Sequence, residues 1–221
     1  MSISWTYVWK IFQVSIPYLG QTIWIAICAF LIAMLLALVL SIVNENRIPV
    51  LYQIGKVYTS FFRSTPLIAQ LFFFYYGFAQ ISETIRTMKP TTALILIIGL
   101  NQASFMAETL RGAFFSVDQK QREAALACGL TRWQMLYRIV IPQAIRVAVP
   151  ALSNSFVGIM KTTSLGFTIG AMEFLGRAKM EATNLVRFFE GYLVILVVYW
   201  IMIALLSAVQ KKMENKLNNL Y

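Results

Sequence analysis

The side chains best suited to chemistry in this sequence form a polar island between two long apolar stretches. Residues 123–142, EAALACGLTRWQMLYRIVIP, contain Glu123, Arg132 and Arg138, whose charges are too costly to expose to lipid tails. The small Ala124 and Ala125 follow Glu123 and let another backbone approach closely, while the carboxylate can accept a charge-assisted hydrogen bond from a partner arginine. An amphipathic segment resting on anionic lipid explains the basic residues but not this Glu-Ala-Ala run. We therefore expect a protein groove to receive it.

Local signals predict how this island folds. Asp118, with Gln121 three residues later, is typical of a cap for a helix over 119–128, and Gly129 suits the left-handed position after it. Thr131 with Gln134 predicts a second capping box. In the second helix one apolar face is expected, ending where proline interrupts the helix. That face comprises Trp133, Leu136, Tyr137 and Val140, and the proline is Pro142.

Charged residues inside the apolar stretches form a second set. Lys161 falls at the centre of an expected membrane span, where insertion of lysine costs at least about 2.5 kcal/mol, so it should face protein, water or a ligand. It either binds a ligand carboxylate or forms an ion pair inside the bundle, for instance with Glu108 or Glu173. Glu108 and Arg111 lie one turn apart, which is typical of a local ion pair; the alternative is that Glu108 receives a substrate ammonium.

The sequence Ser64-Thr65-Pro66 is typical of a helix start. Pro66 at the first helical position, with Ser64 or Thr65 as the cap, would leave free N–H groups and the positive end of a helix dipole facing whatever binds there. A carboxylate is a natural occupant of such a site. An ordinary capped helix start is the other interpretation.

The elements that must position these residues are membrane helices. The chain is 59% hydrophobic with a mean hydropathy of +0.68, too apolar for a soluble domain. We expect an all-α integral membrane protein forming one domain over residues 1–221, with a cytoplasmic loop at about 112–146. The five predicted transmembrane helices cover about 20–43, 64–82, 90–110, 147–172 and 190–210.

The distribution of basic residues predicts the orientation. The net charge is +10, but 12 of the 19 Lys and Arg residues lie in one set of loops and 6 in the other. The positive-inside rule therefore places the N-terminus outside and the C-terminus in the cytoplasm, and the basic excess is not a surface for nucleic acid.

Some activities are excluded by composition. The sequence has no histidine, no G-x-x-x-x-G-K-[ST] phosphate loop and no G-x-G-x-x-G run after a strand. We expect neither an enzyme nor a cofactor-binding chain. Any active transport must draw its energy from an ion gradient or from another subunit.

The spacing of the polar island resembles a known family. E-A-A, three residues, Gly, nine residues and I-x-L-P form the loop signature of the membrane subunits of bacterial ABC importers. Ile141 stands where leucine is usual. The residues that match it are Glu123, Ala124, Ala125, Gly129, Ile139 and Pro142.

Other segments narrow the resemblance to the polar amino-acid branch. FFRSTPLIAQLFFFYYG (61–77), AETLRG (107–112) and KTTSL (161–165) are similar to segments of that branch, and the C-terminal stretch resembles the L-cystine permeases most closely. Ser64 stands where glycine is usual and Thr162 where aspartate is usual. The uncharged Thr162 weighs against an importer specific for arginine or lysine.

The resemblance implies a type I ABC importer permease in the bacterial inner membrane, crossing it several times. It implies a homodimer or a heterodimer with a homologous permease, two copies of a separate ATPase that bind ATP and Mg, and an extracytoplasmic solute-binding protein that delivers a polar amino acid, L-cystine above others. Glu123, Ala124, Ala125 and Gly129 are the expected ATPase-coupling residues. The expected substrate-binding residues are Ser64, Thr65, Gln70, Glu108, Lys161, Thr162 and Ser164.

Two alternatives stay open at the level of sequence. An ion-coupled secondary amino-acid carrier would also use a broken helix near Pro66 and a buried Lys161. Such carriers usually have internal repeats, and none is evident. A lipid-embedded enzyme or a membrane scaffold is the other alternative, although the chain offers it little chemistry.

Overall fold

The computed structural model describes residues 3–218, and within these residues the chain is helical with no strands. The elements in chain order are α1 (Trp5–Ser15), η1 (Ile16–Tyr18), α2 (Leu19–Asn46), α3 (Pro49–Ser64), α4 (Leu67–Phe72), η2 (Phe73–Gly77), η3 (Phe78–Gln80), α5 (Glu83–Arg86), α6 (Pro90–Phe115), α7 (Gln119–Ala127), α8 (Arg132–Met135), η4 (Leu136–Val140), α9 (Ile141–Thr162), η5 (Thr163–Ile169), α10 (Phe174–Asn184) and α11 (Phe188–Asn218). The predicted all-α class is confirmed.

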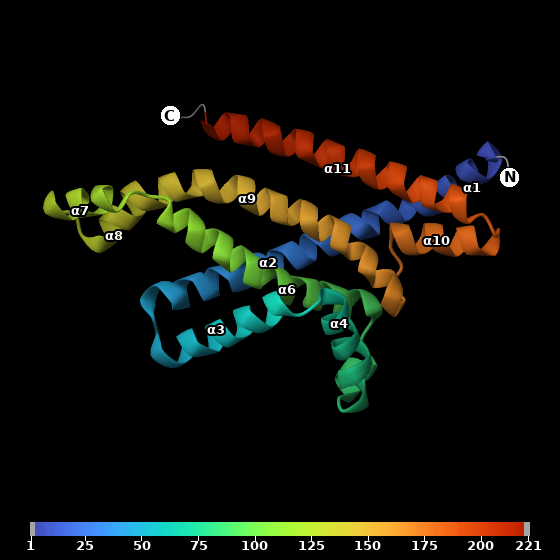
Figure 1. Cartoon of the computed structure of the whole chain (residues 1–221), viewed down its shortest axis with the longest axis horizontal. Helices are drawn as coiled ribbons and strands as arrows, with labels where there is room; N and C mark the ends of the chain where they lie inside the picture. Colours follow the sequence, from blue (N-terminus) through green and yellow to red (C-terminus); the bar gives the residue numbers. More distant parts are fainter. Residues whose placement is uncertain (1–2, 219–221) are drawn as a thin grey trace.

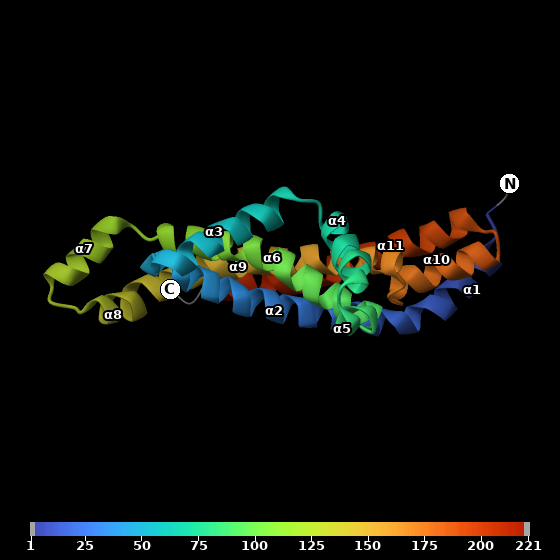
Figure 2. The same cartoon turned by 90° about the horizontal axis from the view of Figure 1, so that it is seen from below.

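Four helical segments of the described chain are long and apolar enough to cross a membrane. Most of their length lies side by side along the long axis of the molecule (Figure 1). The hairpin made by α7 and α8 projects at one end, and α1 and α10 lie at the other (Figure 2). The four segments are Trp5–Asn44, Pro90–Phe115, Arg132–Ile169 and Phe188–Lys216.

The predicted span at 64–82 is the exception. Its apolar helix, Leu67–Gln80, contains 14 residues and would reach about 21 Å at ~1.5 Å per residue, short of a bilayer core of about 30 Å. It also runs across the long axis and away from the bundle (Figures 1 and 2). The count of five spans is therefore not confirmed.

Helix α3 folds back along α2 because the turn between them is sharp. Arg47 adopts the left-handed conformation with φ 46° and ψ 41°, and Pro49 is the first residue of α3. The antiparallel helix packs closely: Gly55 is buried, and the Tyr58 hydroxyl donates a hydrogen bond to the carbonyl of Leu100 in α6. The amphipathic segment expected from the sequence thus lies against the bundle, and α4 leaves it at an angle.

The sequence predicts that Pro142 interrupts the second helix of the hairpin, but in the structure the helix continues through Pro142. Residues 132–169 form one helical segment, because the turn before the proline, Leu136–Val140, is a π-turn. Proline lacks an N–H and its ring clashes with the carbonyl four residues earlier, and a wider turn at that point accommodates both defects. The interruption becomes a local change of helical period.

A buried carboxylate fastens the end of the molecule that carries α1 and α10. The Glu173 side chain is fully buried and accepts hydrogen bonds from the Thr22 hydroxyl (3.1 Å), the Tyr199 hydroxyl (3.1 Å) and the Gly176 N–H (2.8 Å). Burial raises the pKa of this carboxyl, and the hydrogen bonds oppose the rise. The network ties α2 and α11 to the start of α10.

Candidate functional site

The ends of the hairpin helices follow the sequence signals closely. The Asp118 side chain accepts a hydrogen bond from the N–H of Lys120 at 2.9 Å. Gly129 has φ +80°, and Leu130 N–H bonds back to the Ala125 carbonyl at 3.1 Å, so α7 ends in a Schellman motif. The second helix has the predicted reciprocal capping box between Thr131 and its Gln134 partner.

Helix α7 has an inner and an outer face. Ala125 is 5% exposed and packs with Ala113, Met135 and other residues of the hairpin core. Glu123 and Ala124 are exposed on the opposite face, where the Gln119 amide donates to the Glu123 carboxylate at 3.2 Å. Of the three residues predicted to contact a partner, Glu123 and Ala124 therefore face outward and Ala125 faces inward.

Two predictions in the hairpin are wrong. Gln121 forms no capping box with Asp118, because its amide oxygen accepts a hydrogen bond from Gln143 at 2.7 Å. The expected apolar face is also displaced: Trp133 and Tyr137 are 81% and 75% exposed. Val140, a member of the predicted face, is buried, and the π-turn at Leu136–Val140 changes the helical period so that Met135 is buried with it.

The break between α3 and α4 is sealed by side-chain amides. The last turn of α3 leaves carbonyl groups without helical partners. Gln70 Nε2 donates to the Thr65 hydroxyl at 2.7 Å and lies 3.2 Å from the Phe62 carbonyl, which also accepts from Asn101 Nδ2 at 3.0 Å. Asn101 Nδ2 reaches Gln70 Oε1 at 3.0 Å as well. The residues predicted here as substrate ligands thus close a polar network across α3, α4 and α6.

The predicted capping of this helix start is wrong. Pro66 itself is the N-cap of α4, no side chain caps the helix, and the Thr65 hydroxyl instead donates back to the Phe61 carbonyl at 2.8 Å. Ser64 is the last residue of α3 and is exposed. Because proline fixes its own φ near −65° and disfavours a helical residue before it, the chain must extend at Thr65 before it turns again.

Lys161 lies in the last turn of α9, not at the centre of a span. Its side chain is exposed, and among the side chains that the structure describes it forms no ion pair with Glu108, Glu173 or another acid. The neighbouring hydroxyls are used locally: Thr162 donates to the Gly158 carbonyl at 2.6 Å and Ser164 to the Lys161 carbonyl at 2.7 Å. A cationic side chain is therefore displayed beside two hydroxyl groups.

Glu108 forms the local ion pair that its spacing indicates. Its Oε2 lies 2.7 Å from an Arg111 guanidinium nitrogen and 4.0 Å from one of Arg63 at the end of α3. The carboxylate is therefore already neutralised by arginine from two helices. The longer of the two ion pairs joins α6 to the end of α3.

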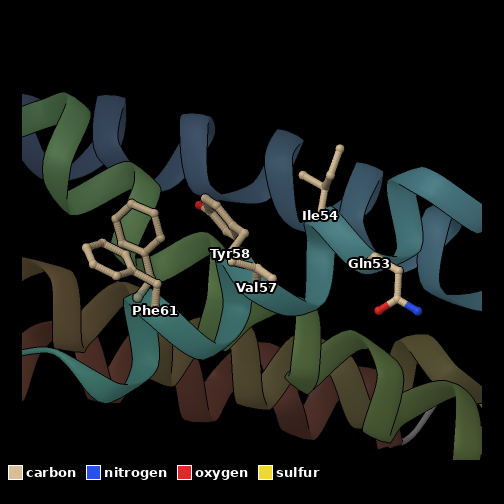
Figure 3. A pocket seen from close by; sticks show the side chains of 6 residues that line it. Gln53, Ile54, Val57, Tyr58 and Phe61 are labelled. Carbon is tan, nitrogen blue, oxygen red and sulfur yellow. The ribbon is translucent and has the colours of Figure 1, made fainter.

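An apolar groove of about 510 Å³ runs along α3 (Figure 3). Ile54 and Val57 on its wall are 57% and 71% exposed, and the Tyr58 hydroxyl is already bonded to α6. An amino-acid zwitterion needs convergent charged or polar groups, and Gln53 is the one amide here. The lining therefore offers no charged group to an amino-acid zwitterion. It consists of Gln53, Ile54, Val57, Tyr58, Phe61 and Phe62.

Comparison with known proteins decides the class. A family model described as the inner membrane component of binding-protein-dependent transport systems matches residues 29–219, which include the hairpin, the break and Lys161. This chain belongs to that family.

Known relatives of this permease are amino-acid transport proteins. It is 40% identical over 220 residues to the probable amino-acid permease protein YxeN of Bacillus subtilis, covering 100% of this chain and 98% of that protein. It is 34% identical to the L-cystine transport system permease protein TcyB of the same organism, covering 95% and 88% of the two chains. A crystal structure of an amino acid ABC transporter with histidines superposes with a TM-score of 0.91 at 26% identity, covering 98% of this chain and 100% of that chain.

These relationships establish an amino-acid ABC importer permease with the type I permease fold, located in the bacterial inner membrane. The permease is not an enzyme, and the ATPase is a separate subunit. The family places the energy source in that subunit, and so it favours the importer over the secondary carrier.

Sequence reasoning missed two polar residues of this site. Asn101 lies in an uncharged stretch and gives no charge signal, although an amide within a membrane helix indicates a partner that satisfies it. In the sequence, Arg122 looks like an ordinary basic residue of a cytoplasmic loop. In the structure it is half-buried and donates a hydrogen bond to the end of α6. The sequence signal for Arg122 is its position three residues before Ala125, which places both residues on the same face of the helix.

Proposed function

We propose that this permease imports L-cystine or a closely related polar amino acid. Support comes from the relative TcyB, whose name states L-cystine, and from Thr162, which replaces an acid by a neutral hydroxyl. Without an aspartate carboxylate at position 162, the site lacks a natural partner for the side-chain cation of arginine or lysine.

The substrate is tested by reconstituting the permease with its ATPase and its binding protein in liposomes. L-Cystine should stimulate ATP hydrolysis and accumulate in the vesicles, while arginine and lysine should do neither. Stimulation by arginine or lysine, with none by cystine, would refute the assignment.

We further propose that the substrate carboxylate binds Lys161, with Thr162, Ser164 and the network around Thr65 and Gln70 lining the route. Support comes from the exposed ammonium beside two hydroxyls, which no acid among residues 3–218 neutralises. Ser64 lies next to this network. Glu108 would receive the substrate ammonium, which would replace Arg111 as the partner of the carboxylate.

Lys161→Ala should lower uptake at least about tenfold, since a charge-assisted hydrogen bond contributes about 1.5–3 kcal/mol, while assembly with the ATPase is retained. Lys161→Arg keeps the charge and should retain part of the uptake. Unaltered uptake by the alanine variant would give Lys161 a purely structural role.

We propose that the outer face of α7, with Glu123 and Ala124, enters a groove of the ATPase subunit, and that Gly129 and the buried Ala125 hold the hairpin in shape. Two such permeases, identical or homologous, would surround the pathway, with two ATPase subunits and one extracytoplasmic binding protein. ATP and Mg would bind to the ATPase subunits and not to this chain. ATP-driven closure of the ATPase pair would then shift the permease between its two states.

A further inference from the structure

The inner face of α7 is fastened to two different membrane helices. The Arg122 guanidinium donates a hydrogen bond to the carbonyl oxygen of Phe114, in the last turn of α6. One residue earlier, Gln121 accepts a hydrogen bond at 2.7 Å from Gln143, in the first turn of α9. The short helix that faces outward through Glu123 therefore carries its attachments on its other side.

The two attachments differ in strength. The Phe114 carbonyl is one of the last four of α6, which have no partner within the helix, and a cation there also meets the negative end of the helix dipole. A charge-assisted hydrogen bond from a half-buried arginine is stronger than a neutral bond between two glutamine amides, one of them exposed. The attachment to α6 is the firmer of the two.

Apolar packing alone would not fix α7 in direction. Ala125 belongs to a buried apolar cluster that also holds Ala113 of α6 and Ala144 of α9, and apolar packing of this kind is non-directional. A hydrogen bond to one backbone carbonyl sets both the distance and the rotation of α7 relative to α6.

We propose that Arg122 is a positioning residue that makes α7 and the inner end of α6 move as one body. Helix α6 carries Asn101, whose amide bonds both Gln70 and the Phe62 carbonyl at the break between α3 and α4. A displacement of α7 thus reaches the break through one rigid helix. This inference rests on the proposed docking of α7 to the ATPase.

The test uses the permease in complex with its ATPase and binding protein. Arg122→Met keeps the length of the side chain but removes every donor, and Arg122→Lys keeps a cation that can bond the same carbonyl. Arg122→Met should retain the ATPase subunit on purification but transport at least about fivefold less amino acid per ATP hydrolysed, within the range of typical coupling energies. Arg122→Lys should restore most of that ratio. Arg86→Met, on the exposed α5, is the matched control.

An unchanged ratio of transport to hydrolysis in Arg122→Met would overturn the inference. So would loss of the ATPase subunit from that variant, because Arg122 would then serve docking and not coupling. A wild-type permease that retains no ATPase would instead contradict the proposed function, and this is determined before any variant is made.

A second measurement leaves Arg122 in place and so does not depend on the folding of a variant. Spin labels on the exposed Cys128 and on Phe115→Cys, with Cys28→Ala, report the distance between α7 and the end of α6. That distance should be the same in the nucleotide-free and ATP-bound complexes. A change of several ångströms between the two states would show that α7 and α6 move separately and would overturn the inference.

Discussion

At the break between α3 and α4, two amide side chains replace the hydrogen bonds that the helix loses. Backbone carbonyls inside a membrane have no water to bond, and each unsatisfied group carries a large penalty. Gln70 reaches the Thr65 hydroxyl and carbonyl, and Asn101 reaches the Phe62 carbonyl. These residues make a broken helix tolerable at this position.

Replacing Gln70 by leucine should leave two of these acceptors without their partner. An unsatisfied buried polar group costs about 1–3 kcal/mol, so the variant should unfold at a temperature several degrees lower in detergent. Gln53→Leu changes the same residue type at an exposed position of α3 and should leave the melting temperature within about one degree. Equal melting temperatures for both variants would contradict a sealing role.

At the scale of single elements, helix caps stabilise the hairpin, and a change of helical period keeps the long helix continuous. The Schellman motif at Gly129 and the box at Thr131 bring α7 and α8 together over a few residues. The π-turn at Leu136–Val140 then lets one helix continue through Pro142 into the membrane. The hairpin and α9 are therefore joined by continuous helix.

Gly129→Ala tests the hairpin. A residue with a side chain costs about 1–2 kcal/mol in the left-handed conformation, and this cost should raise the rate of proteolytic cleavage within the hairpin about 5- to 30-fold. Gly112→Ala, in α6 with open space around its Cβ, should leave the rate unchanged. If both substitutions give the wild-type rate, the left-handed turn does not control the stability of the hairpin.

Local signals explain which of these features the sequence predicts. A capping box or a glycine after a helix depends on residues three or four positions apart, so Thr131, Gln134 and Gly129 behave as predicted. The apolar face predicted for the second helix is wrong at Trp133 and Tyr137, because a π-turn adds a residue to one turn and hydrophobic periodicity assumes a constant 3.6 residues per turn. Ala125 turned inward because its neighbours come from the ends of α6 and α9, distant in the sequence.

At the scale of the whole molecule, hydropathy predicts the long helices well and the broken one poorly. Length and apolar composition identify α2, α6, α9 and α11, whereas the segment at 49–80 divides its apolar surface between an amphipathic helix and a short one. A hydropathy window cannot detect a helix break at Pro66, or the hydrogen bonds from α6 that satisfy the backbone at that break. The predicted placement of Lys161 at mid-span was wrong for a related reason, since α9 begins earlier than its apolar stretch.

The same scale explains how the parts are combined. The hairpin lies at one end of the long axis, the Glu173 network at the other end, and the break with its polar side chains between them (Figure 1). Helices α6 and α9 connect these regions. In the proposed coupling, α6 carries a displacement of the hairpin to the polar network at the break.

Uptake by the reconstituted complex tests this account most directly. Proteoliposomes containing the permease, its ATPase and the binding protein should accumulate L-cystine when ATP is supplied to the ATPase side, and Glu123→Arg should reduce that uptake at least about tenfold, because it places a like charge against the expected partner arginine. An ion gradient without ATP should drive no uptake. Uptake by the permease alone under an ion gradient, or full ATP-driven uptake with Glu123→Arg, would contradict the account.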